Sequence, residues 1–396
     1  MLERRALILA AACLSAASAF AEPTATEAIP ARPPTAEELK QLLVDASVAR
    51  LNRLLGGSPS GGPETIQLKF FEPDGEGGEG GWGVVYDWKL AKKTQRMPEE
   101  EDIRSGEPFG FSQMSYQFAL KGSHAFRDAV NNEDLSTATL SLHLDRADLG
   151  RANIDEIAGE VFQQCLMDAG PTPTDEQTKA CIETGAVDRL LADEPTAWLY
   201  NLNFHGGLEA NQDYTNSRGL YGLNVVFVSE PSAAASRYNV FDLPFRALRK
   251  SMSPGSRYRA SFPSLSFSLD RLDAKDDEIR AAFTSKSTFT RASAEVAFQT
   301  ILASFDEGPL RFNISYRYFH EFSPPEAIKI ANLDSFDYTK MQLRFPARLL
   351  PIVETDEYEL FVSYTDGKLP FDVTSGKAIE VGISTSIDML ARLLAK

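Results

Sequence analysis

The chain contains little histidine, little cysteine and no excess of positive charge. Its 396 residues include 4 His and 3 Cys, and 40 Lys and Arg stand against 56 Asp and Glu, for a net charge of −16. This balance offers no basic field to a polyanion, so nucleic-acid binding by the whole chain is excluded as a first interpretation. Because the few His and Cys show no ligand spacing, we expect no metal site and no cofactor.

Long apolar runs are also missing. After residue 21 the sequence has no stretch of about 18 apolar residues, so we expect no transmembrane helix in the mature chain. A hydrophobic content of 43% with 10% aromatic residues nevertheless excludes a disordered chain. The length suffices for one large domain or two ordinary ones.

The first 21 residues have the pattern of an export signal. Arg4 and Arg5 precede a short apolar stretch that begins at Ala6, and Ala19 and Ala21 place small residues where a signal peptidase cleaves. We expect cleavage after Ala21 and export. Together with the alternating strands from residue 64 onward, this signal predicts the outer membrane of a Gram-negative cell as the destination.

From residue 64 onward the dominant pattern has a period of two. In the clearest run, Leu310, Phe312 and Ile314 alternate with Arg311 and Asn313. Successive side chains of a strand point to opposite faces, so each such run predicts a strand with one apolar and one polar face. The runs are residues 64–72, 82–90, 114–121, 138–145, 198–205, 218–229, 258–271, 289–303, 310–318, 336–346, 358–365 and 379–387.

The length of these runs favours strands that cross a membrane. A tilted strand needs roughly 9–11 residues to cross a bilayer, whereas strands of globular proteins average about 5–6 residues. The polar faces carry a mixture of Lys, Arg, Glu, His and Asn that no dry core could hold unpaired. Polar faces turned to a wet lumen and apolar faces turned to lipid resolve that conflict.

This layout resembles bacterial outer-membrane β-barrel proteins as a class. The segment Glu380–Ile387 partly fits the usual last strand of such barrels, but Thr385 replaces a hydrophobic residue and the chain lacks the terminal Phe. The resemblance implies an all-β fold, an antiparallel transmembrane β-barrel of about 12 strands, with outer-membrane lipid as its surroundings and a porin-like lumen.

The segments outside the strands define the expected domain organisation. Residues 22–63 form a Pro-rich leader and an amphipathic helix, residues 64–388 the barrel, and residues 389–396 a helical tail. Residues 150–195 form a helical insertion in which Cys165 and Cys181 flank a Pro-rich turn. After export to an oxidising compartment such as the periplasm, a structural disulfide between these two cysteines is expected.

Charged residues on the polar faces are the candidate lumen lining. They are Lys121, Arg291, Glu295, Arg311, Arg317, Lys340, Arg344, Glu359 and Glu380. In a barrel of about 12 strands these charges either line an open pore or pair and fill it. The main hypothesis is therefore a passive channel or a scaffold, with small polar solutes as partners in the first case.

One string of residues suggests catalysis. Ser141, His143 and Asp145 lie on one face of one predicted strand, in the order nucleophile, base and orienting acid. Residues two apart on a strand are about 7 Å apart, so we expect no direct Ser–His hydrogen bond. An outer-membrane lipid-acting hydrolase stays an alternative, but an enzyme is not the favoured interpretation. His205 and His320 are expected to be isolated.

A soluble periplasmic β-barrel or sandwich that binds a ligand is the other alternative. Such a fold also alternates, but its apolar faces point inward and its polar faces meet water. The orientation of the two faces therefore decides between the membrane and the soluble interpretation.

Overall fold

A computed structural model describes the protein. It describes residues 65–71, 81–96, 110–126, 135–148, 196–252, 258, 260–305, 308–349, 358–371 and 376–386. The expected signal peptide, leader, helical insertion with Cys165 and Cys181, and C-terminal tail lie outside the described residues.

Strands make up most of the described chain, as the period-two pattern predicts. The strands are β1 (Thr65–Phe71), β2 (Gly81–Arg96), β3 (Gly110–Ala125), β4 (Ser136–Asp148), β5 (Ala197–Ala210), β6 (Ser217–Glu230), β7 (Ser264–Asp276), β8 (Thr288–Phe305), β9 (Gly308–Phe322), β10 (Ser335–Pro346), β11 (Tyr358–Gly367) and β12 (Gly376–Ser386). Each predicted run overlaps one of them. The run at 258–271 was placed too early, because β7 begins only at Ser264.

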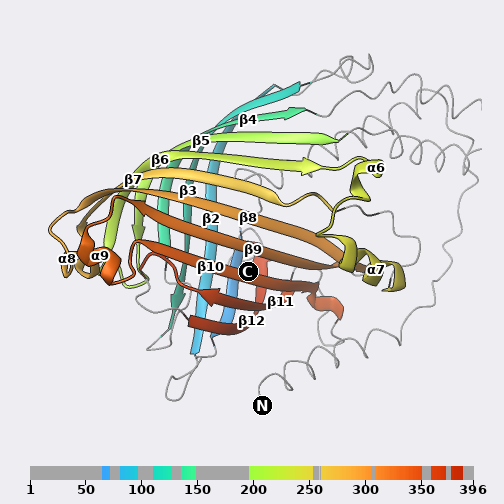
Figure 1. Ribbon diagram of the computed structural model, residues 1–396. Helices are drawn as coiled ribbons and strands as arrows, with labels where there is room; N and C mark the ends of the chain where they lie inside the picture. Colours follow the sequence, from blue (N-terminus) through green and yellow to red (C-terminus); the bar gives the residue numbers. More distant parts are fainter. Residues whose placement is uncertain are drawn as a thin grey trace, which may run out of the picture.

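The strands form one closed antiparallel barrel (Figure 1). Each strand pairs with its neighbours in sequence, and β1 pairs with β12 from Thr65↔Ser386 to Phe71↔Glu380. This pairing leaves the sheet without an edge, so no strand needs another chain to satisfy its backbone. The predicted 12-stranded barrel is confirmed.

Apolar side chains cover the outside of the barrel. Leu90 and Leu140 are each 64% exposed, and Phe267 is 57% exposed, although all three belong to strands. The other large exposed apolar residues of the wall include Tyr116, Phe118, Tyr200, Phe204, Tyr221, Val225, Leu269, Val296, Tyr316, Met341, Val381 and Ile383.

Polar side chains line much of the inside, beside two apolar clusters at the hairpin end. Ser115 is fully buried, and Gln117, His143 and Asn201 are 3% exposed or less. This arrangement is the reverse of that in a water-soluble barrel, whose apolar faces point inward. The alternative of a soluble barrel or sandwich with an apolar core is therefore wrong.

The two ends of the barrel differ. At one end, here the hairpin end, short connections join β5 to β6, β7 to β8 and β9 to β10, and carry the helices α8 (Glu278–Ala281) and α9 (Glu326–Ile330). At the opposite, terminal end, β1 begins and β12 ends, and the β6–β7 connection carries α6 (Ala233–Ser236) and α7 (Leu243–Met252) (Figure 1). The 3-10 helix η1 (Ala347–Leu349) follows β10 there.

Among the described residues, no helix has both the length and the apolar character needed to cross a membrane.

Leu140 on β4 tests the assignment of the apolar face. Replacing it by Arg places a charge in the lipid-facing belt, and we expect a loss of about 2–4 kcal/mol in the free energy of unfolding. Leu140→Phe, which keeps the position apolar, should change it by far less. The measurement is urea unfolding in phospholipid vesicles, followed by tryptophan fluorescence. An equal effect of both substitutions would contradict a lipid-facing Leu140.

Candidate functional site in the barrel lumen

The predicted lumen-lining charges lie on the inward faces of their strands, and eight of the nine belong to the following ion pairs. Ion pairs within 4.0 Å join Lys121 to Asp87, Arg291 to Glu209, Arg317 to Glu295, Arg311 and Arg344 to Glu359, and Glu380 to Lys69. Lys340 shares the inward face of β10 with the buried Gln342. The sequence left open whether these charges line an open pore or pair with one another. Most of them pair.

The deepest of these pairs lies at the seam of the barrel. Lys69 on β1 and Glu380 on β12 are 1% and 0% exposed, and Lys69 Nζ lies 2.7 Å from Glu380 Oε1. Ser363 on β11 donates a second hydrogen bond to Glu380 Oε2 at 2.8 Å. A charged pair buried to this extent survives only with its remaining groups satisfied, which these contacts provide.

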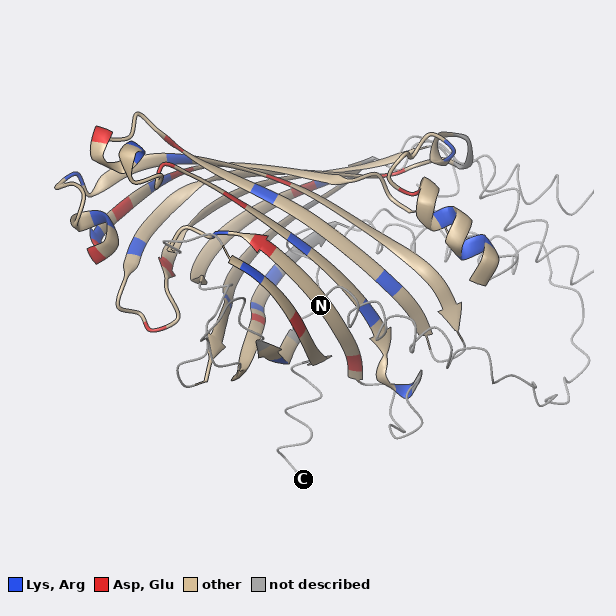
Figure 2. Cartoon of the chain, turned by 60° about the horizontal axis from the view of Figure 1, so that its bottom comes forward, with Lys and Arg blue, Asp and Glu red and all other residues tan. Residues whose placement is uncertain are grey.

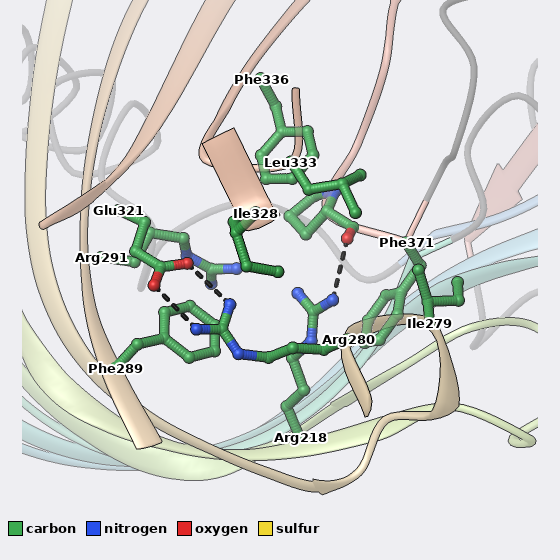
Figure 3. A pocket seen from close by; sticks show the side chains of 11 residues that line it. Arg218, Ile279, Arg280, Phe289, Arg291, Glu321, Ile328, Leu333, Phe336 and Phe371 are labelled. Carbon is green, nitrogen blue, oxygen red and sulfur yellow. Dashed lines mark hydrogen bonds and ion pairs between the residues drawn. The ribbon is translucent and has the colours of Figure 1, made fainter. Parts of the chain in front are cut away.

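A larger group of charges, the arginine cluster, occupies the lumen at the hairpin end. It consists of Arg218, Arg280, Arg291, Glu209, Asp277 and Glu321, all buried. Figure 3 shows the three arginines and Glu321. Arg280 forms a two-pronged pair with Glu321, with N–O distances of 2.7 and 2.8 Å. Arg291 forms another with Glu209, at 2.9 and 2.7 Å. Such forked contacts fix both partners in orientation as well as distance.

Arg218 links the two halves of this cluster. Its Nε donates to Asp277 Oδ2 at 2.5 Å, its Nη2 donates to the carbonyl oxygen of Pro370 at 3.1 Å, and its Nη1 lies 3.6 Å from Glu209. Asp277 also caps the N-terminus of α8, because its Oδ1 accepts from the backbone N–H of Arg280 at 3.0 Å. The cap therefore positions Arg280 within the lumen.

Aromatic rings cover the flat faces of the arginines. The Arg280 guanidinium lies 3.9 Å from the centre of the Phe289 ring, and the Arg218 guanidinium lies 4.2 Å from the centre of Phe371. Phe319 contacts Arg291 in the same way at 5.2 Å. The remaining cavity among these side chains has a volume of about 20 Å³, which is room for about one water molecule. The arginine cluster and its rings therefore pack densely on the β5–β9 side of this end of the lumen.

The charges nearer the terminal end are more open. Arg317 and Glu295 are 39% and 29% exposed, and Arg311 and Glu359 are 36% and 32% exposed. Arg344, at 25%, approaches Glu359 to 3.8 Å. Because these side chains keep much of their hydration, this part of the lumen is wet.

The suspected catalytic string does contain a direct contact. Ser141 Oγ lies 2.8 Å from His143 Nε2, so the expectation that the two residues are too far apart was wrong. The imidazole spans the gap by leaning along β4 toward Ser141. Asp145 does not orient it directly. Asn201 on β5 stands between them, with its amide nitrogen 3.4 Å from His143 Nδ1 and 2.7 Å from Asp145 Oδ1.

The direction of these hydrogen bonds opposes catalysis. Asp145 only accepts when ionised, so Asn201 must turn its NH₂ group toward it, and the same group then donates to His143 Nδ1. The imidazole proton therefore resides on Nε2 and is donated to Ser141, whose hydroxyl donates onward to the carbonyl oxygen of Gln117 at 3.3 Å. A general base would need the opposite arrangement, with Nε2 free to take the serine proton.

From the sequence we expected His205 to be isolated, but the structure gives it a partner. Its Nε2 lies 2.9 Å from Asp270 Oδ1, although β6 separates the two strands. The position between them, opposite both, is Gly222. Since Gly222 has no side chain, His205 reaches across β6. His320, by contrast, lies on the outer face beside Tyr318 and Phe322, without an ion pair in the described chain.

Comparisons with known proteins identify no family. No family model and no curated protein matches the chain. Among solved structures, the β domain of the Bordetella autotransporter BrkA is 9% identical, with a TM-score of 0.28, over 82% of this chain and 99% of that one. The outer-membrane channel DcaP of Acinetobacter baumannii is 6% identical, with a TM-score of 0.29, over 82% and 95%. A loop-deleted OmpT of Vibrio cholerae is 8% identical, with a TM-score of 0.29, over 81% and 97%.

Several residues of the site escaped the sequence analysis. Arg218 begins the predicted run 218–229 and Glu209 lies four residues beyond the run 198–205, so continuing the alternation would have placed both on the inward faces. Asp277 and Arg280 lie on a turn, where the strand period carries no information.

Among the described residues, no group of three or more His, Cys, Asp or Glu could hold a metal ion.

Gly222 allows a specific test of the His205–Asp270 contact. A methyl group there would overlap Asp270 Oδ1 and lie 2.5 Å from the carbonyl oxygen of Leu269, so we expect Gly222→Ala to lower stability by about 1–3 kcal/mol. On the same strand, a methyl group at Gly219 would have its nearest neighbour at 3.8 Å, which makes Gly219→Ala the matched control. The measurement is the temperature at which the folded band is lost in unboiled gel samples. Equal shifts for both variants would refute a special role of Gly222.

The hydrogen-bond direction at His143 is also measurable. We expect the neutral imidazole to carry its proton on Nε2, because the Asn201 amide occupies Nδ1. Proton–nitrogen correlation spectra of the histidine rings in micelles, with His143→Gln for assignment, report the tautomer. A proton on Nδ1 would overturn this reading and restore Ser141 and His143 as a candidate nucleophile and base.

Proposed function

We propose that this protein is an outer-membrane β-barrel that acts as a passive channel for small polar solutes, with a closed gate at its hairpin end. The observation that carries the proposal is the location of the obstruction. Side chains of α8 and of the adjoining strands pack into the lumen with ion pairs there, while the pairs Arg317–Glu295 and Arg311–Glu359 are partly exposed.

The outer membrane is the destination that the surface chemistry favours. An apolar outer wall with polar residues inside suits a barrel in lipid, and closed barrels are one of the two structures that span membranes. The export pattern that ends at Ala21 supports the same destination.

The nature of the obstruction favours a gate over a permanent filling. Replacing buried ion pairs by well-packed apolar residues is often neutral or stabilising, so a barrel that served only as a scaffold would gain little from this cluster. Ion pairs can exchange their partners for water when they separate, which apolar packing cannot do. The retained charges therefore suit a lumen that opens to water.

The open part of the lumen favours anionic solutes. Its partly exposed charges are Arg311, Arg317, Arg344 and Lys340 against Glu295 and Glu359, which leaves two positive charges in excess. Arg and Lys side chains that line a pore favour anions. A lipid-acting hydrolase receives no support from the lumen, because the hydrogen bonds around Ser141 run in the non-catalytic direction.

Removing one ion pair of the arginine cluster tests the gate. We expect the double variant Arg280→Ala, Glu321→Ala to raise single-channel conductance in planar bilayers several-fold, because it empties the lumen without leaving an unpaired charge. The matched control is Glu326→Ala, Lys329→Ala, which removes an exposed pair from α9 at the same end and should behave as the wild type. If the wild type and both variants carry no current after verified insertion, the protein is a scaffold and the channel proposal fails.

A further inference from the structure

The connection between β6 and β7 crosses the outside of the barrel at the terminal end. Its helix α7 packs on β8 and β9, where the Phe245 ring lies 6.0 Å from Phe298 and 4.9 Å from Phe312. Phe298 and Phe312 have the same strand parity as Val296 and Tyr316, which are exposed on the outer wall. The helix therefore lies against the outer wall and does not enter the lumen (Figure 1).

A buried polar cluster fixes this helix in place. Arg249 donates to Asp242 Oδ2 at 2.7 Å and to Thr300 Oγ1 at 3.0 Å, and Thr300 in turn donates to Asp242 Oδ1 at 3.0 Å. The Tyr258 ring lies 4.9 Å from the Arg249 guanidinium, and burial raises the pKa of its phenol, which keeps it neutral. Asn239 ties the segment to the backbone before β7 by bonds to Ala260 and Ser261. The helix is thus held rigidly in one orientation.

That orientation separates an apolar side from a basic side. Phe241 and Phe245 contact Phe298, whereas Arg249 contacts Thr300, which lies two residues nearer the terminal end of β8. Around α7, Arg246, Arg249 and Lys250 lie on one flank of the face that contacts β8, and Phe245, Leu248 and Met252 lie on the other flank. This is the polarity of an amphipathic helix in the plane of a membrane interface.

The apolar side is largely uncovered by the described chain. Large apolar residues of the segment are Tyr238 at 80% exposure, Val240 at 64%, Phe241 at 50%, Leu243 at 49% and Leu248 at 42%. A patch of this kind is unusual on a water-facing surface, and here it adjoins the apolar outer wall of the barrel. Continuity with the lipid-facing wall indicates lipid as the surface that covers it.

The charge of the segment is opposite to that of the chain. Residues 231–252 contain Arg237, Arg246, Arg249 and Lys250 against a single acid, Asp242, in a chain of net charge −16. Asp242 is buried in its contacts with Arg249 and Arg246. Arg237 and Lys250 are exposed and form no ion pair with any described residue, and Figure 2 shows the basic positions along α7.

We propose that residues 237–252 form an interfacial lipid-binding element that inserts its apolar side among acyl chains and binds the phosphates of anionic phospholipids through Arg237 and Lys250. The element anchors the terminal end of the barrel at the membrane surface and fixes the depth of the wall in the bilayer. This inference rests on the membrane-spanning part of the proposed function, and it does not depend on whether the lumen conducts.

Tryptophan probes in the full-length protein test the proposal. The native Trp82, Trp88 and Trp198 are replaced by Phe, and a single Trp is introduced as Leu248→Trp on α7 or, as a reference, as Phe267→Trp on the outer wall. Each protein is inserted into vesicles that contain phosphatidylcholine and phosphatidylglycerol, with bromine on the acyl chains of one lipid at a time. Quenching by brominated lipid measures contact with that lipid.

We expect the Trp at position 248 to be quenched by brominated lipid and shielded from aqueous iodide. Brominated phosphatidylglycerol should quench it more than its share of the mixture predicts. The charge reversal Arg237→Glu, Lys250→Glu should lower this preference about fivefold for each cation removed. The matched control Lys286→Glu, Lys329→Glu, which reverses two exposed charges at the hairpin end, should leave it unchanged.

Three results would overturn the proposal. Quenching of the position-248 probe by iodide and not by lipid would place α7 in water or against a protein partner. Equal quenching by both lipids would remove the phosphate contact. A preference that survives charge reversal would assign it to other groups. The reference probe separates these failures from a wrong membrane assignment, because a Trp at position 267 that no lipid quenches would refute the spanning barrel itself.

Discussion

The pairing of β1 with β12 is the constraint on which the rest of the molecule depends. Once the sheet is closed, each side chain of the wall points either into the lumen or outward. The alternation of polar and apolar residues along a strand then places the polar ones inside and the apolar ones outside. Closure brings Lys69 and Glu380 from opposite ends of the chain to 2.7 Å. Closure also fixes which face of each strand contacts lipid, because only the outward face can reach it. The apolar face must therefore point outward and the polar face inward.

Confinement in the lumen then decides how the charges behave. Across a barrel of this size, long side chains from opposite walls and from the hairpin turns meet, and unpaired charges there would be costly. The arginine cluster resolves this with two forked pairs and with aromatic rings over the guanidinium faces. Where the pairs are more exposed, as at Arg317 and Glu295, water contributes the remaining solvation.

The sequence allowed the twelve strands and their facing to be predicted, because both follow from a period of two that is local to each run. Contacts between runs were harder. The Ser141–His143 distance was misjudged because strand spacing was applied to a side chain that leans along the strand. The His205–Asp270 contact joins β5 to β7 across Gly222 on β6, which has no side chain. A pattern local to one strand cannot reveal a contact that depends on the pairing of three strands. Arg280 was missed because α8 sits on a turn, whose path only closure determines.

Two populations of arginine explain why the lumen cluster and the outer helix serve different roles. Arg291 is 6% exposed and already receives a carboxylate that matches both prongs of its guanidinium, so an incoming anion would have to displace a buried partner. Arg237 is exposed and keeps its hydration, and a lipid phosphate can replace water there at little cost. The same side chain therefore locks the barrel when it is desolvated among acids and offers a binding surface when it is not.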